Sequence, residues 1–152
     1  MTSVNQVFTE AQRQLLTAAL NRIIPAQDEF PGAGDLGLAA FVERAVSQET
    51  ALTRQFVEGL AQIDIAAVRL HGGSFTDLSA ANQDATLKNV ESRFPDFFMG
   101  LVRQCYNGYY TNPDVFDLIG YALPMPEDYH PKPFDESLLE PQRQRAPFWR
   151  PV

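Results

Sequence analysis

Residues 50–73, TALTRQFVEGLAQIDIAAVRLHGG, decide the fold class. Apolar side chains recur in this stretch every three or four residues, which is the spacing of one face of an α-helix. They are Leu52, Phe56, Leu60, Ile63 and Ala67. Gly72 and Gly73 follow, and they supply the left-handed conformation in which many helices end. The stretch therefore predicts a long amphipathic helix that buries its apolar face against other elements.

Two helices are predicted before this stretch. Thr9 and Gln12 form a capping-box pair at the start of the first, whose apolar residues keep helical spacing until Pro25 ends it. Glycine, proline and acidic residues then predict an ordered loop over 25–37. A second helix is predicted over 38–46.

Three shorter helices are predicted after residues 50–73. Ser79 is placed to cap a fourth helix, and Pro95 opens a fifth from a first-turn position. Asn112 and Pro113 form an N-cap and N1 pair for a short sixth helix that Gly120 closes. No alternating strand pattern is found. The sequence therefore predicts an all-α fold, a small bundle of five to six helices.

The composition changes abruptly after Gly120. Seven of the eleven prolines lie in the last 32 residues, a density at which no regular helix is expected. This segment nevertheless keeps aromatic residues, in which disordered tails are usually poor. They are Tyr121, Tyr129, Phe134, Phe148 and Trp149. The sequence thus predicts a helical domain over 1–120 and an extended, proline-rich C-terminal arm over 121–152 that packs on a partner subunit.

Charge and hydropathy restrict the expected partners. Nineteen acidic and twelve basic residues give a net charge of −7, which repels phosphate backbones, so nucleic acid is not an expected partner. No stretch approaches the roughly 20 apolar residues that span a bilayer, so no membrane span is expected. Residues 1–14 lack the basic-then-apolar pattern of an export signal, which favours a cytoplasmic location. Co-export to the periplasm with a partner is the alternative.

Reactive side chains are few and scattered along the sequence. Cys105 falls on an apolar stripe and is expected to be a small buried hydrophobe. His71 is expected at a helix C-terminus, where its cation interacts with the helix dipole, and His130 is a candidate hydrogen-bond donor to a partner. One cysteine and two histidines are too few for a closed Cys/His metal site. We therefore expect no active site, metal or cofactor in this chain.

Two motifs carry a resemblance to a known family. Residues 16–46, LTAALNRIIPAQDEFPGAGDLGLAAFVERAV, contain a helix, an I-I-P-A-x-D turn, a P-G-A loop and a second helix. Residues 108–121, GYYTNPDVFDLIGY, contain a G-Y-Y, a short capped helix and a G-Y. In this order the two motifs resemble the opening and closing segments of the gluconate 2-dehydrogenase subunit 3 family.

The resemblance implies a noncatalytic small subunit of a flavin-dependent dehydrogenase of the glucose–methanol–choline type. In such complexes the large subunit holds FAD and abstracts hydride from a sugar, sugar acid, polyol or glycoside. FAD is therefore expected in the partner, and this chain is expected to support folding and stability of that large flavoprotein in a hetero-oligomer. The alternative is a stand-alone helical adaptor or binding protein without an enzymatic partner.

A partner interface is predicted from the aromatic residues of the closing motif and the arm. Prolines lower the entropy that an extended chain loses on binding, and aromatic anchors dominate interface energies. The predicted interface residues are Tyr109, Tyr110, Tyr121, Tyr129, His130, Phe134, Phe148 and Trp149. Arginines of the arm are expected to pair with acidic groups at its rim. An arm that wraps around its own bundle is the alternative.

Overall fold

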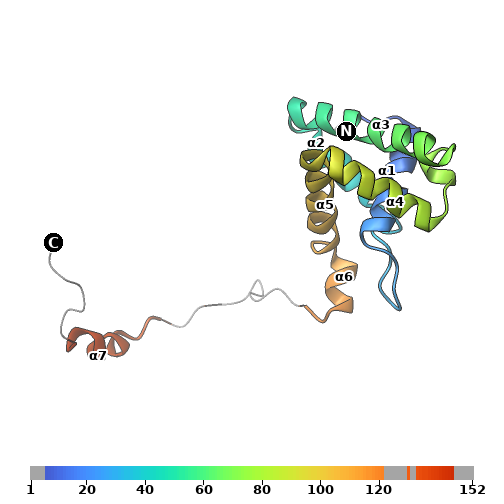
Figure 1. Cartoon of the computed structure of the whole chain (residues 1–152). Helices are drawn as coiled ribbons and strands as arrows, with labels where there is room; N and C mark the ends of the chain where they lie inside the picture. Colours follow the sequence, from blue (N-terminus) through green and yellow to red (C-terminus); the bar gives the residue numbers. More distant parts are fainter. Residues whose placement is uncertain (1–5, 122–129, 131–132, 146–152) are drawn as a thin grey trace. The chain divides into compact units, whose positions relative to one another are not determined.

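The computed structural model describes residues 6–121, 130 and 133–145. The chain divides into two units, Met1–Ala122 and Leu123–Val152. Within the described residues the first unit is helical and has no strand, which confirms the predicted all-α fold (Figure 1). Its helices are α1 (Glu10–Ile23), α2 (Leu38–Val46), α3 (Thr50–His71), the 3-10 helix η1 (Phe75–Asp77), α4 (Ala80–Arg93), α5 (Pro95–Tyr109) and α6 (Pro113–Leu118). Of these, only the single turn η1 was not predicted.

Local sequence signals set the helix ends. The Thr9 hydroxyl accepts a hydrogen bond from the backbone N–H of Gln12, whose side chain in turn accepts one from the backbone N–H of Thr9. The side chains of Ser79 and Asn112 cap α4 and α6. Gly72 ends α3 with a φ of 75°, a conformation that residues with a Cβ rarely adopt. These caps satisfy backbone groups that a helix leaves without internal partners.

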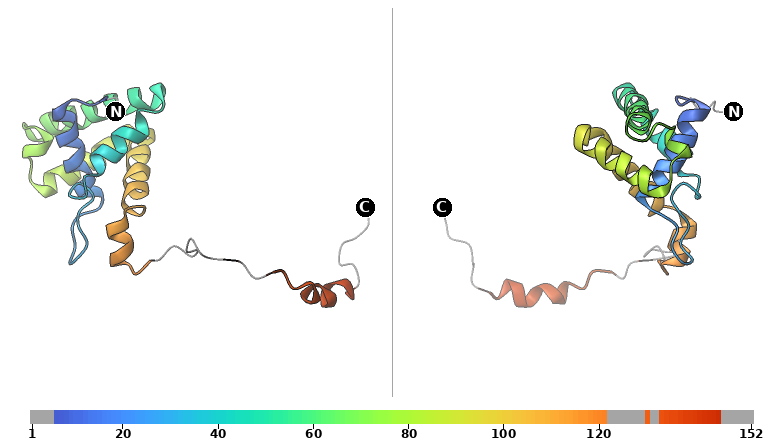
Figure 2. Two further views of the ribbon diagram at one scale, coloured as in Figure 1. Left: turned by 180° about the vertical axis from the view of Figure 1, so that it is seen from behind. Right: turned by 45° about the vertical axis from the view of Figure 1, so that its right-hand side comes forward.

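The core lies around α3, which packs against α1, α2, α4 and α5 (Figure 2). Gly59 lets the Phe97 ring lie directly against α3, because a Cβ at residue 59 would overlap that ring. Phe97 meets Phe56 edge to face, with ring centroids 5.5 Å apart. Burying one such aromatic side chain stabilises the fold by about 1.5–3 kcal/mol. The largest fully buried apolar side chains are Phe56, Phe75, Leu16, Leu20, Leu60, Ile63, Leu101, Val42, Val46, Val90 and Val115.

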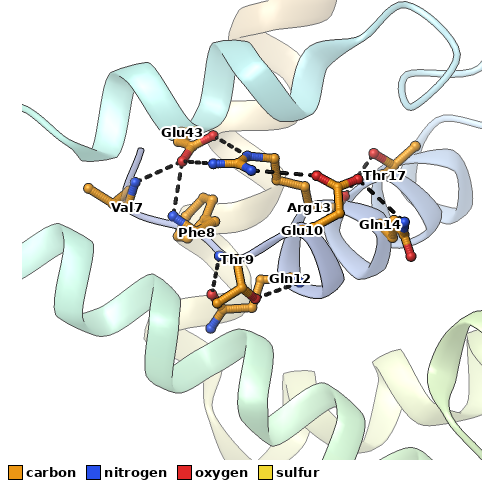
Figure 3. A network of polar contacts seen from close by, with 9 residues as sticks. All are labelled: Val7, Phe8, Thr9, Glu10, Gln12, Arg13, Gln14, Thr17 and Glu43. Carbon is orange, nitrogen blue, oxygen red and sulfur yellow. Dashed lines mark hydrogen bonds and ion pairs between the residues drawn. The ribbon is translucent and has the colours of Figure 1, made fainter. Parts of the chain in front are cut away.

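A buried carboxylate on α2 holds the segment before α1 (Figure 3). Glu43 is 4% exposed, and its Oε1 accepts hydrogen bonds from the backbone N–H groups of Val7 and Phe8 at 2.8 and 2.9 Å. The Arg13 guanidinium donates to both carboxylate oxygens, at 2.8 and 3.0 Å. The hydrogen bonds from Arg13, and then those from the backbone, lower the pKa of Glu43 against the opposing effect of burial. The ionised carboxylate therefore keeps Phe8 in the core.

The second unit contains short helical turns where none was expected. The 3-10 helix η2 spans Glu136–Leu139, and α7 spans Glu140–Arg143. The expectation that the arm forms no helix is wrong for these residues. Pro141 lies in the first turn of α7, where the missing N–H removes no intrahelical hydrogen bond. Asp135 also caps η2, because its side chain accepts a hydrogen bond from the backbone N–H of Ser137 at 2.9 Å.

Candidate interaction surface

The reactive side chains singled out in the sequence do not converge in the described part of the chain. Cys105 is fully buried, as predicted, and burial raises its pKa to about 12, which leaves little thiolate at neutral pH. His71 ends α3, and its Nε2 is buried with no hydrogen-bond partner among the described atoms. His130 is exposed in the second unit. Across residues 6–121, 130 and 133–145, no group of three or more His, Cys, Asp or Glu side chains is placed to hold a metal ion.

A depression of about 340 Å³ lies between α3 and the start of α5. Amide, carboxylate, guanidinium and aromatic side chains line it, with no histidine or cysteine among them. Its lining residues include Gln55, Glu58, Arg93, Phe94 and Asp96. This set offers no nucleophile with an adjacent base. In the described part of the chain, the exposed aromatic side chains are a more distinctive surface feature than this depression.

Two exposed tyrosines stack on the last turns of α5. Tyr106 is 44% exposed and Tyr110 is 51% exposed, and their rings are parallel within 1° with centroids 5.9 Å apart. Residues four positions apart lie on the same face of a helix, which places these rings one above the other. The pair presents flat apolar surface together with two hydroxyl groups.

Tyr109 lies next to this pair but on the buried face of α5, and its ring meets that of Tyr110 edge to face. It is 3% exposed, and its hydroxyl donates a hydrogen bond to the carbonyl of Pro31 at 2.9 Å. Leu101 and Cys105 precede it at four-residue steps on the buried face of the helix. Although Tyr109 was predicted as an interface residue, the structure therefore places its ring in the core of its own domain.

The end of α6 presents two further apolar residues. Gly120 has a φ of 65° and donates to the carbonyl of Asp117, and the N–H of Tyr121 donates to the carbonyl of Phe116 at 2.9 Å. These two bonds form a Schellman motif, in which contact between the flanking apolar side chains is common. The Tyr121 and Phe116 rings make this contact, with centroids 5.0 Å apart. Tyr121 and Ile119 remain 48% exposed each.

The loop between α1 and α2 is braced against the helices. The side-chain oxygen of Asn21 accepts hydrogen bonds from the backbone N–H groups of Gly34 and Asp35, and the Pro31 carbonyl is held by Tyr109. At the tip of the loop, Gln27 and Phe30 exchange two backbone hydrogen bonds of 2.9 Å.

Two acidic residues, Asp28 and Glu29, form the exposed turn at this tip. Asp28 has a φ of 52°, a left-handed conformation that Asp tolerates better than most residues. Figures 1 and 2 show the loop at the same end of the first unit as α6.

We refer to the exposed apolar residues at this end as the α5–α6 surface, which comprises Tyr106, Tyr110, Ile119 and Tyr121. Two of them, Tyr110 and Tyr121, were predicted as interface residues. Sequence reasoning missed Tyr106, although its spacing of four residues from Tyr110 is a readable signal. In the second unit, Phe134 is 67% exposed. The predicted interface residues Tyr129, Phe148 and Trp149 lie outside the described residues.

The comparison with protein families identifies one match. Residues 10–123 match the family described as Gluconate 2-dehydrogenase subunit 3. No curated protein and no solved structure shows detectable similarity to the chain. Among the described helices, none has the length and apolar character needed to cross a membrane.

Proposed function

The chain belongs to the gluconate 2-dehydrogenase subunit 3 family, and we propose that it is the noncatalytic small subunit of an FAD-dependent oxidoreductase complex. In this proposal the large subunit is a flavoprotein of the glucose–methanol–choline type, which carries FAD and oxidises a sugar, sugar acid or glycoside. The small subunit supports folding and stability of that flavoprotein. The observation that supports the proposal is the exposure of apolar side chains on the α5–α6 surface. It is made on a chain whose family is described as a dehydrogenase subunit.

The physical argument rests on the composition of that surface. Three of its four residues are tyrosines, a residue type enriched at protein interfaces because it buries apolar area while its hydroxyl keeps a polar partner. Exposed apolar patches that exceed the ordinary scatter mark interaction sites. A small subunit that binds the folded flavoprotein, and not its unfolded chain, stabilises the fold by mass action. The gain is about 2.7 kcal/mol when the free subunit is present at 100 times its Kd.

Co-expression tests the proposal. A flavoprotein large subunit of the same genome is expressed with and without an affinity-tagged form of this chain. We expect the chain to raise the soluble yield, the flavin absorbance per protein and the dehydrogenase activity, and to copurify with the flavoprotein in a fixed ratio. Equal yield, flavin content and activity in both cultures contradict the proposal. They favour the stand-alone adaptor, which is monodisperse and stable by itself.

Truncation tests the contribution of the arm. Residues 122–152 are deleted, which leaves nearly all of the first unit, Met1–Ala122. We expect weaker binding to the flavoprotein with an unchanged helical circular-dichroism signal and a cooperative melt. Unchanged affinity excludes the arm from the interface. A truncated chain that melts at a markedly lower temperature instead favours an arm that wraps around its own bundle.

A further inference from the structure

A small depression between α3 and α4 is lined by nitrogen donors. Its volume is about 110 Å³, and it lies beside the end of α4, where Phe94 leads into α5. Its polar side chains are Gln62 and Arg69 of α3 and Asn89 and Arg93 of α4. Its remaining lining residues are apolar, so no described carboxylate lines it. The depression therefore presents two positive charges and two amide groups without a negative charge.

Helical spacing brings these side chains together. Gln62, Ala66 and Arg69 follow one another at steps of four and three residues on α3, and Asn89 and Arg93 are four residues apart on α4. Residues at these spacings lie along one face of a helix, and α3 packs directly against α4 (Figure 1). Ala66 is 5% exposed and contributes only a methyl group, which leaves space between the longer side chains around it.

A hydrogen bond orients part of this donor set. The Nη2 group of Arg69 donates to Oδ1 of Asn89 at 3.1 Å. Because Oδ1 accepts this bond, the Nδ2 group of Asn89 remains a donor. Neither Arg69 nor Arg93 forms an ion pair within the described part of the chain. The site thus holds charged donors for which the described residues supply no charged acceptor.

The nearest carboxylates have other partners. Two neighbouring depressions share lining residues with this one, and they are bordered by Glu58 and Asp96 and by Asp64. Glu58 pairs with Arg54 at 3.5 Å, and Asp64 accepts a hydrogen bond from the backbone N–H of Phe75 at 3.2 Å. Asp96 lies in the first turn of α5, where the helix dipole stabilises a carboxylate. None of the three forms an ion pair with the arginines of the site.

The size and the apolar lining restrict the ligand. Pockets that enclose a drug-sized molecule measure about 300–1,000 Å³, so a depression of about 110 Å³ suits a single small group. The planar guanidinium group of arginine matches a carboxylate with two parallel hydrogen bonds. Ile65 and Phe94 also line the depression and offer apolar contact to carbon atoms attached to that group.

We propose that this depression binds the carboxylate group of a short organic acid or of an acidic side chain. Arg69 and Arg93 bind the carboxylate from two different helices, and the Asn89 amide adds an uncharged donor. Ile65 and Phe94 contact the adjoining carbon atoms. A free acid and a glutamate of another protein present the same chemistry, and the test distinguishes these two sources. The site is independent of the proposed function, so either can fail without the other.

The test is a titration of the full-length, ¹⁵N-labelled chain followed by NMR. The probe is propionate, which has the structure of the end of a glutamate side chain, and sodium chloride keeps the ionic strength constant. Propionamide, the uncharged analogue, is the control ligand. Arg69→Gln and Arg93→Gln each remove one guanidinium group, and Arg103→Gln, at an exposed arginine of α5, is the matched control. Circular dichroism and thermal melts establish that each variant folds.

We expect saturable shifts of amide signals in residues 62–69 and 89–94 with propionate, and none with propionamide. Arg69→Gln and Arg93→Gln should each weaken binding roughly tenfold, because each removes charge-assisted hydrogen bonds. Arg103→Gln should leave the affinity unchanged. If one of the two site variants does not fold, the other decides.

Three results overturn the proposal: no saturation with propionate, equal affinity in both site variants, or the same shifts with chloride alone. The last result indicates only a general attraction of anions to exposed arginines. A glutamate-containing peptide with blocked ends then identifies the source of the ligand. Tighter binding of the peptide than of propionate supports a site for an acidic side chain, whereas binding no tighter than propionate supports a site for a free acid.

Discussion

Replacing Glu43 by alanine is expected to destabilise the helical domain by about 3 kcal/mol. The carboxylate accepts four hydrogen bonds, two from Arg13 and two from the backbone of Val7 and Phe8. Hydrogen bonds to charged groups contribute roughly 1.5–3 kcal/mol each, but the desolvation of the buried carboxylate, which costs several kcal/mol, offsets much of their sum. Removing Glu43 also releases Phe8, which is 3% exposed in the core.

Urea and thermal unfolding of the full-length chain measure this effect. A destabilisation of 1 kcal/mol lowers the Tm of a domain of this size by about 4 °C, so we expect a decrease of roughly 12 °C. Glu58→Ala is the matched control, because Glu58 pairs with Arg54 at 3.5 Å between side chains that are 69% and 80% exposed. Such exposed pairs contribute less than about 1 kcal/mol. Glu43→Gln, which keeps one acceptor oxygen, should lie between the wild type and Glu43→Ala.

The pH dependence gives an independent check. Because folding lowers the pKa of Glu43 from its ordinary value of 4.5, its stabilising contribution is fully present above that pH. The contribution is lost as the pH falls through the lower pKa of the folded state. The stability difference between wild type and Glu43→Ala should therefore shrink below pH 4.5. A difference of less than about 1 kcal/mol at pH 7, or one that stays constant through the acid range, would refute this reasoning.

Three further predictions concern α5 and α6. Asn112→Ala removes the cap of α6 and should cost about 1 kcal/mol of stability in urea unfolding; an unchanged midpoint contradicts the cap. Tyr109→Phe deletes the hydroxyl that bonds Pro31 and should cost about 1 kcal/mol. Amide hydrogen exchange in residues 25–37 should accelerate in that variant, and unchanged exchange contradicts the bracing role. Cys105, with its pKa raised to about 12 by burial, should resist a thiol reagent at pH 8 until the chain unfolds; rapid labelling of the folded chain contradicts its burial.

Helix ends were predictable from sequence because the interactions that set them are local. The Thr9 and Gln12 capping box, the Gly72 stop and the Asn112 cap each join groups within four residues of one another. Such signals depend only on neighbouring backbone and side-chain groups, and the structure confirms all three. The prediction for the arm was wrong because it used the density of prolines and ignored the position of Pro141, which lies in the first turn of α7. A proline interrupts a helix only where its missing N–H or its ring affects a preceding turn.

Interactions between distant residues were not predictable. Glu43 joins Val7 across 36 positions, and Arg22 on α1 pairs with Asp84 on α4 across 62 positions at 2.7 Å. In the sequence these residues resemble the solvated charges that any amphipathic helix carries. Their pairing depends on how the helices pack, which periodicity does not specify.

The separation of buried and exposed tyrosines was available from helical spacing. Adjacent helix positions differ by about 100° in direction, so consecutive tyrosines point in different directions and need not be equally buried. Tyr109 continues the buried row of Leu101 and Cys105, whereas Tyr110 continues the row of Tyr106. The prediction grouped residues 109 and 110 as interface residues because both belong to the G-Y-Y motif. It did not take into account the different directions in which the helix presents them.

The segment 108–121 contains two kinds of residue. Some fix the structure at this end of the domain, and others expose their side chains to solvent there. Gly108 admits Phe41 of α2, because a Cβ there would lie 2.8 Å from the Phe41 ring, and Tyr109 holds the loop through Pro31. Gly120 supplies the left-handed residue of the Schellman motif. The side chains that these residues position, Tyr110 among them, contribute little to the core because about half of their surface is exposed. An arrangement that fixes apolar side chains in contact with solvent gains little for the stability of the isolated domain, and under the proposed function its benefit lies in the complex.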